Sequence, residues 1–92
     1  MNFSKALKKI KSGQALARKS WDGKDMFVFL APSVAFNVHS EPLLSLLGAG
    51  AEVFRGEHIA LRSGEERDCV WSPLQVDMFA NDWQVVLETG PQ

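Results

Sequence analysis

The first apolar residues of the chain recur at the spacing of a helix. They fall at positions i, i+3, i+4 and i+7 and form one stripe, while lysines occupy the other face; these residues are Phe3, Ala6, Leu7 and Ile10. Gly13 follows the last of them, and glycine commonly stands just past the end of a helix. The pattern therefore predicts a short amphipathic helix at the N-terminus.

Two pairs of strand-like runs predict two hairpins. Residues 14–21 and 26–31 flank Asp22-Gly23, a dipeptide that suits the positive φ angles of a tight turn. The run 26–31 does not alternate polar with apolar residues, which predicts a strand covered on both faces, by the core and by another subunit. Residues 58–62 and 67–71 flank Ser63-Gly64-Glu65-Glu66 and predict the second hairpin.

The C-terminal third predicts one more helix and one more strand. Ser72 suits the N-cap of a helix, Pro73 its first helical position, and Gln75 the third position, where it closes a capping box. A short helix should then run to Ala80, followed by a strand over residues 83–88 and a flexible tail over residues 89–92.

The middle of the chain, residues 32–56, has no regular pattern. Prolines and glycines bracket the apolar run 43–47, which is too short for a stable free helix, so we expect it at a contact between subunits. The whole pattern predicts an α+β fold. A small antiparallel sheet, an N-terminal helix and a short second helix would form a single domain over residues 1–88.

Composition adds the expectation of an oligomer. A domain of 92 residues buries only roughly 60–65% of the surface that its unfolded chain exposes. Yet 46% of the residues are hydrophobic, including six Phe and three Trp. These apolar side chains are more than a small core can bury, so we expect other copies of the chain to cover part of the apolar surface.

Charge and cysteine content exclude several classes of protein and of site. Ten basic and eleven acidic residues give a net charge of -1. Proteins that bind duplex nucleic acid usually carry a strongly basic surface, so this class is excluded. No apolar run is long enough to cross a membrane and no signal peptide is evident, so we expect a cytoplasmic protein. Cys69 is alone, which excludes an internal disulfide and a cysteine-based zinc cluster.

Two tryptophan-bearing segments, residues 17–23 and 71–83, carry the candidate chemistry. Each sets an indole beside Arg, Asp, Gln or Asn, the mixture that stacks on a planar ligand and fixes its polar edges. Neither contains a recognisable nucleophile and base, and the histidines match no metal-ligand spacing. We therefore expect binding without catalysis, metal or cofactor. The candidate ligand-binding residues are Arg18, Trp21, Asp22, Met26, Ser72, Gln75 and Asp77.

Each of these residues also has a purely structural interpretation. Trp21, at the end of a strand, either stacks on a base or packs in the core. Arg18 stands three residues earlier, so a regular strand would point it to the opposite face, and the two share a pocket only through a bulge or between subunits. A solvated Arg18 is the alternative.

The candidate residues on the predicted second helix also have alternative interpretations. Asp77 has no partner evident from the sequence and is the better candidate for a ribose hydroxyl, with a surface carboxylate as the alternative. Gln75 lies two positions away and does not share its face. The helix start at Ser72 offers N–H groups to a pyrophosphate. Trp71 and Trp83 are expected in the core.

Several of these residues together resemble a known family. They are Met1-Asn2-Phe3 with Ala6-Leu7, Gly13, Ala17-Arg18, Trp21, Gly23, His58-Ile59, and Trp71-x-Pro-x-Gln-x-Asp77 followed by Asp82-Trp83. The set resembles the second type of Thoeris anti-defence protein, found in phages and prophages. The resemblance covers residues 1–88, although residues 32–55 carry little of it.

The resemblance implies a molecular sponge. Members of that family bind the cyclic ADP-ribose isomers that Thoeris enzymes make from NAD, and sequester them without cleavage. Some also hold cyclic oligonucleotides of the CBASS defence system at separate sites, and they form homotetramers with pockets between subunits. The alternative is a structural or regulatory oligomer that binds a protein and no nucleotide; a hydrolase of NAD-derived nucleotides is a third, minor possibility.

Overall fold

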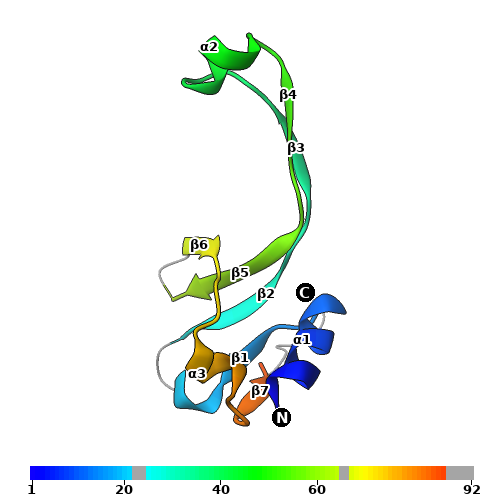
Figure 1. Ribbon diagram of the computed structural model, residues 1–92, viewed down its shortest axis with the longest axis vertical. Helices are drawn as coiled ribbons and strands as arrows, with labels where there is room; N and C mark the ends of the chain where they lie inside the picture. The colour runs from blue at the N-terminus through cyan, green and yellow to red at the C-terminus, as the bar shows by residue number, and fades with distance from the viewer. Residues whose placement is uncertain (22–24, 65–66, 87–92) are drawn as a thin grey trace.

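The computed structural model, which describes residues 1–21, 25–64 and 67–86, consists of a body and an arm. The body comprises residues 1–31 and 58–86, and the arm, residues 34–55, extends away from it (Figure 1). The longest dimension is 47 Å and the radius of gyration is 16.3 Å. A compact chain of this length would have a radius of about 12 Å, so the arm makes the molecule markedly extended.

Helix α1 (Phe3–Lys11) forms where the sequence predicts it. The Asn2 side chain caps its first turn by accepting a hydrogen bond from the Lys5 N–H at 2.9 Å. Gly13 follows the helix with a φ of 104°, a conformation that favours glycine. Ala6 and Ile10 are fully buried against the sheet.

Within the described residues, the body contains a five-stranded antiparallel sheet in the order β6-β5-β2-β1-β7. Its strands are β1 (Leu16–Arg18), β2 (Phe27–Ala31), β5 (His58–Ser63), β6 (Arg67–Val70) and β7 (Trp83–Val85). The pairs β1–β2 and β5–β6 confirm the two predicted antiparallel pairings. The proposed turn residues Asp22, Gly23, Glu65 and Glu66 lie outside the described residues.

The strand predicted over residues 14–21 is shorter than expected. β1 ends at Arg18, and the 3₁₀ turn η1 (Lys19–Trp21) follows it. In β2, Val28 is fully buried while Phe27 and Phe29 on the other face are partly buried. Leu30, on the same face as Val28, is partly buried, so within one chain only Val28 of β2 is completely covered. The expected cover of the other face by another subunit stays a prediction.

The expectation of an irregular middle segment was wrong. Strands β3 (Val34–Asn37) and β4 (Glu52–Arg55) pair antiparallel, with Val34 opposite Arg55 and Phe36 opposite Val53. They continue the direction of β2 and β5, and helix α2 (Leu43–Leu47) lies at the tip (Figure 1). Neither strand has a buried face, so no alternation of buried and exposed positions marks them between the prolines and glycines.

The predicted helix start at Ser72 was also wrong. Helix α3 (Gln75–Met78) begins at Gln75 with Leu74 as its N-cap. The Asp77 carboxylate accepts a hydrogen bond from the Leu74 N–H at 2.9 Å, so Asp77, and not Gln75, completes the cap. The acceptor in a capping box stands three residues after the N-cap. Since this acceptor is Asp77 and not Gln75, the N-cap is Leu74 and the helix begins two residues later than predicted.

The body core lies between α1 and the sheet. Its fully or almost fully buried members are Ala6, Ile10, Leu16, Val28 and Trp83. Phe3, Trp21 and Trp71 pack around Trp83, whose Nε1 donates a hydrogen bond to the Asp77 carbonyl at 2.9 Å. The expectation that Trp83 is a core residue is confirmed. No helix in the described part of the chain has the length and apolar character to cross a membrane.

Candidate functional site

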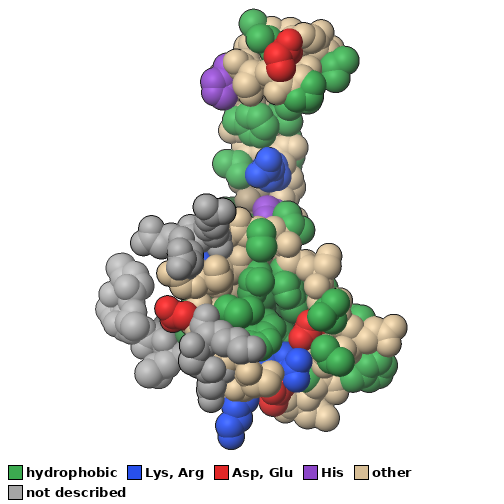
Figure 2. All heavy atoms as spheres, turned by 90° about the vertical axis from the view of Figure 1, so that its left-hand side faces the viewer, with side chains coloured by type: hydrophobic (Ala, Val, Ile, Leu, Met, Phe, Trp, Pro, Cys, Tyr) green, Lys and Arg blue, Asp and Glu red, His purple; other side chains and the backbone are tan. Residues whose placement is uncertain are grey.

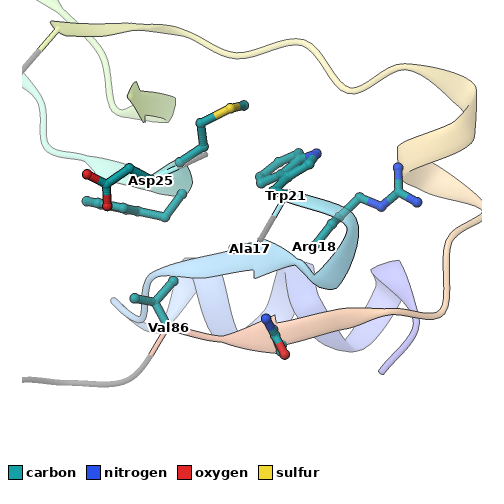
Figure 3. A pocket seen from close by; sticks show the side chains of 8 residues that line it. Ala17, Arg18, Trp21, Asp25 and Val86 are labelled. Atoms are coloured by element: carbon teal, nitrogen blue, oxygen red, sulfur yellow. The ribbon is translucent and has the colours of Figure 1, made fainter. Parts of the chain in front are cut away.

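A groove with a volume of about 380 Å³ lies beside β1 (Figure 3). Small-molecule sites commonly have volumes of about 300–1,000 Å³. The described residues that line it are Ala17, Arg18, Trp21, Asp25, Met26, Phe27, Gln84 and Val86. We call this cavity the β1 groove. Its lining combines an indole and apolar side chains with a guanidinium, a carboxylate and an amide.

The β1 groove opens on the sheet face opposite α1. Ala17 pairs with Gln84, and the flanking pairs place Leu16 and Trp83 in the core. Because side chains alternate along a strand, Ala17 and Gln84 must point to the opposite face. The groove floor is therefore formed by the sheet face opposite α1.

The turn η1 brings Arg18 and Trp21 to the same groove. A regular strand would have separated them, but β1 ends at Arg18 and the chain turns. The Trp21 ring meets Trp83 edge-on, with centroids 5.4 Å apart, and Trp71 at 6.5 Å. Trp21 is only partly buried. It thus contacts the aromatic core and also lines the groove (Figure 3).

The predicted site residues fall into two groups. Arg18, Trp21 and Met26 line the β1 groove, and Asp22 lies outside the described residues. Ser72, Gln75 and Asp77 are not among the described residues that line it.

Sequence reasoning missed Asp25 and Gln84. Gln84 could have been predicted from the sequence pattern. It follows the buried Trp83 in a strand, so its side chain must face away from the core. Asp25 adopts a φ of 56°, which the residue type alone did not indicate.

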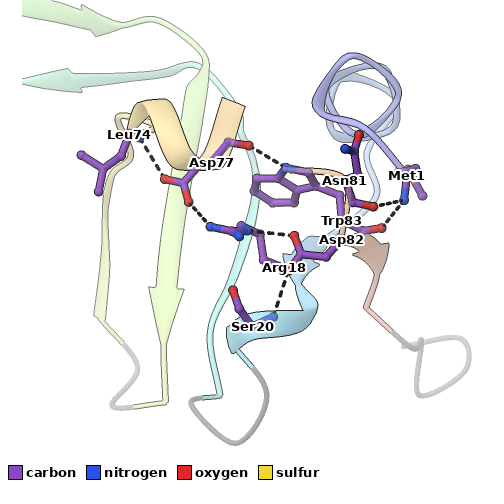
Figure 4. A network of polar contacts seen from close by, with 8 residues as sticks. All are labelled: Met1, Arg18, Ser20, Leu74, Asp77, Asn81, Asp82 and Trp83. Carbon is purple, nitrogen blue, oxygen red and sulfur yellow. Dashed lines mark hydrogen bonds and ion pairs between the residues drawn. The ribbon is translucent and has the colours of Figure 1, made fainter. Parts of the chain in front are cut away.

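Asp77 belongs to a polar network beside the groove (Figure 4). Arg18 Nη1 lies 3.0 Å from Asp77 Oδ1, and Arg18 Nε lies 2.9 Å from Asp82 Oδ1. The Ser20 N–H donates to the second Asp82 oxygen at 3.2 Å. Arg18 therefore bridges two carboxylates that come from α3 and from the loop before β7.

The structure gives Asp77 partners that the sequence did not reveal. Asp77 is only 6% exposed, so it is no surface carboxylate, and Arg18 and the Leu74 N–H bind its two oxygens. Its partner was hidden because Arg18 stands 59 residues away in the sequence. The assignment of Asp77 to a ligand hydroxyl stays a prediction, and a ligand would have to share this carboxylate with Arg18.

The network shifts the pKa values of Arg18 and Asp82. The hydrogen bond to Asp82, followed by that to Asp77, raises the pKa of Arg18 above its ordinary value. The hydrogen bond from Arg18 lowers the pKa of Asp82 below its ordinary value. Both groups are therefore ionised at neutral pH. Among the described residues, no three His, Cys, Asp or Glu side chains gather as metal ligands would.

Comparison with known proteins identifies the family. The model of the Thoeris anti-defense 2-like domain matches residues 1–86. The chain belongs to the Thoeris anti-defense 2-like family. It is also 34% identical, in an alignment of 91 positions that covers 94% of each chain, to the protein named Thoeris anti-defense 2 of Bacillus phage SP01. The resemblance stated from the sequence is confirmed, and membership in this family supports an anti-defence role.

Proposed function

We propose that this chain binds a cyclic ADP-ribose-type immune signal in the cytoplasm of the infected bacterium and sequesters it without cleaving it. Membership in the Thoeris anti-defense 2-like family supports the biological setting. The observation that carries the chemistry is the β1 groove, in which a partly exposed indole adjoins polar side chains of both charges.

The lining of the groove matches the parts of such a ligand. The Trp21 indole offers a face for an adenine, and base stacking on aromatic side chains contributes about 1–3 kcal/mol. The Asp25 carboxylate and the Gln84 amide suit ribose hydroxyls. Arg18 also lines the groove; because Asp77 and Asp82 already pair with it, a pyrophosphate would have to compete with these carboxylates for its guanidinium.

The pKa shifts of Arg18 and Asp82 do not favour either group as a general base. A general base works best when its pKa lies near the operating pH. The network moves both of its shifted groups away from neutrality, because the pKa of Asp82 is lowered and that of Arg18 is raised. Each is therefore suited to fixed contacts and poorly suited to proton transfer.

The exposed apolar surface supports a homotetramer as the active form. An isolated two-stranded sheet is marginally stable in water, yet the arm exposes Val34 by 53% and Phe54 by 71%. Leu46 at its tip is 74% exposed. We propose that other copies cover the arm, and that a second copy also faces the open side of the sheet and completes the β1 groove.

The body carries a second apolar surface. Figure 2 shows hydrophobic side chains gathered on the face where β6 and α3 lie. Its most exposed members are Val70, Leu74, Val76 and Phe79. This surface is the observation that favours the second candidate function, an oligomeric module that binds a protein and no nucleotide.

A thermal-shift screen separates the two candidates. Cyclic ADP-ribose isomers should raise the melting temperature, because a ligand that binds only the folded state at a hundred times its Kd adds about 2.7 kcal/mol of stability. Cyclic dinucleotides of the CBASS type form a second arm of the screen, and NAD serves as the linear control. If no cyclic nucleotide raises the melting temperature, the proposal of a sponge is wrong and a protein-binding module is favoured.

Light scattering after size exclusion tests the assembly. We expect four times the chain mass of 10.2 kDa. A mass that stays at that of a single chain at all concentrations would contradict the homotetramer.

A further inference from the structure

Three donors from consecutive residues converge on Asp82. Arg18 Nε donates to Asp82 Oδ1 at 2.9 Å, and the Ser20 N–H donates to Oδ2 at 3.2 Å. Between them, the Lys19 N–H donates to the Asp82 carbonyl at 3.0 Å. One residue from the loop before β7 therefore binds the whole stretch of chain that leads from β1 into η1 (Figure 4).

These contacts redirect the backbone at the end of β1. The pairing of β1 with β7 ends at Arg18 opposite Trp83, and the Lys19 bond to the Asp82 carbonyl follows it. The next N–H, that of Ser20, binds a side-chain carboxylate. Because side-chain acceptors of this kind compete with regular strand bonds, the chain leaves the sheet at this point and forms a 3₁₀ turn.

The turn decides where Trp21 lies. A strand continued through residue 21 would carry its side chain to the face opposite Arg18, away from a shared site. In the structure η1 ends at Trp21, and its ring rests edge-on against Trp83, the residue that follows Asp82. Asp82 thus holds the polar side of the turn, and Trp83 supports the indole from the core.

We propose that Asp82 is a positioning residue for the β1 groove: it fixes Arg18 and the η1 turn so that the Trp21 indole faces the cavity. Asp82 is not among the described residues that line the groove, so its effect passes through Arg18 and Trp21. The consequence for ligand affinity rests on the proposed function, whereas the consequence for the indole does not.

The direct test is the exciton-coupled circular dichroism of the clustered tryptophans, which depends on how their rings are oriented. Trp21→Phe defines the part of the signal that belongs to Trp21. Asp82→Ala should lose most of that part while α1 and the sheet remain folded. Asp68→Ala is the matched control, because Asp68 also pairs with an arginine, at 3.2 Å, but on β6, outside the aromatic core.

Asp82→Asn provides a second variant in case Asp82→Ala does not fold. Its amide oxygen still accepts from the Ser20 N–H but no longer carries the charge that pairs with Arg18. We expect an intermediate loss of the Trp21 signal. A folded Asp82→Ala or Asp82→Asn protein with the full wild-type signal would overturn the positioning role, as would an equal loss in Asp68→Ala.

Affinity for cyclic ADP-ribose, measured by calorimetry, completes the experiment. Asp82→Ala should weaken binding about ten- to a hundredfold, the range expected for loss of one stacked base, and Asp68→Ala should bind as wild type does. If the wild-type protein binds no cyclic nucleotide, the proposed function fails, and the spectra still decide the positioning role. If wild-type binding is strong and Asp82→Ala retains it with a displaced indole, the groove assignment of Trp21 is wrong.

Discussion

The body and the arm use the same kinds of residue in opposite ways. In the body, Leu16 and Val28 are fully buried between the sheet and α1, and Trp83 is 2% exposed. In the arm, Val34 and Phe54 lie on a two-stranded sheet and are more than half exposed. The body therefore has a core of its own, whereas the strands of the arm have paired backbones and mostly exposed side chains, and Val38 is the one described arm residue that is buried.

This difference suggests that the body determines the folding of the single chain and that the arm serves the proposed assembly. Apolar burial supplies most of the favourable free energy of folding, so the body accounts for the stability of the single chain. The arm adds little to that stability, and its exposed apolar side chains are those that the proposed homotetramer would cover. Substitutions in the two regions should consequently affect different measurements.

The largest effect is expected for Trp83→Ala. It removes a buried ring and the hydrogen bond to the Asp77 carbonyl, and it should cost about 3–5 kcal/mol of unfolding free energy. Urea unfolding at a protein concentration at which light scattering finds the single chain measures this. Phe54→Ala is the matched arm variant and should change the unfolding of the single chain by less than about 0.5 kcal/mol. Equal losses for the two would break the distinction between body and arm.

The next effect is expected for Asp77→Ala. It leaves Arg18 Nη1 and the Leu74 N–H without their acceptor in a largely buried setting, which should cost about 2–3 kcal/mol. We therefore expect a lower melting temperature, contrary to what a surface carboxylate would give. Asp68→Ala, which breaks an exposed ion pair, should cost less than about 1 kcal/mol. Similar melting temperatures for both variants would contradict this role of Asp77.

A smaller effect on stability is expected for Trp21→Ala. Its ring is partly buried against Trp83, so the change should cost about 1–2 kcal/mol, while affinity for the cyclic nucleotide should fall about ten- to a hundredfold. Thermal melting and calorimetric binding on one preparation measure the two effects. A variant that melts and binds as wild type does would remove Trp21 from the groove.

The smallest effect concerns pH. The pKa of Asp82 is lowered from its ordinary value of 3.8 by Arg18, so its stabilising contribution is complete above that value and disappears as the pH falls through the lower folded pKa. The melting temperatures of wild type and Asp82→Asn should therefore differ at neutral pH and converge in acid. A difference that persists after the carboxyl is protonated would contradict this linkage.

The sequence predicted the body better than the arm. The stripe of α1 and the two antiparallel pairings of the body follow from local periodicity, and the structure confirms them. The arm strands are only four residues long and lack a buried face, so they leave no comparable pattern. Local pattern reveals elements that bury one face within the chain, and it fails for elements that expose both.

The candidate site shows the same limit. Trp21 was identifiable because an indole beside polar residues is informative without knowledge of the fold. The partnership of Arg18 with Asp77 and Asp82 depends on contacts across 59 and 64 residues, and no local spacing reports it. The turn that unites Arg18 with Trp21 depends on the same long-range contact, so the strand prediction placed them on opposite faces.

The most direct test of the account is recovery of the bound signal. The protein is saturated with a cyclic ADP-ribose isomer, freed of excess ligand, and heated to release what it holds, and the released material is identified by chromatography and mass spectrometry. Sequestration predicts stoichiometric release of the original cyclic molecule, still able to activate the defence effector. A linearised or hydrolysed product, or no retained ligand at all, would contradict the account.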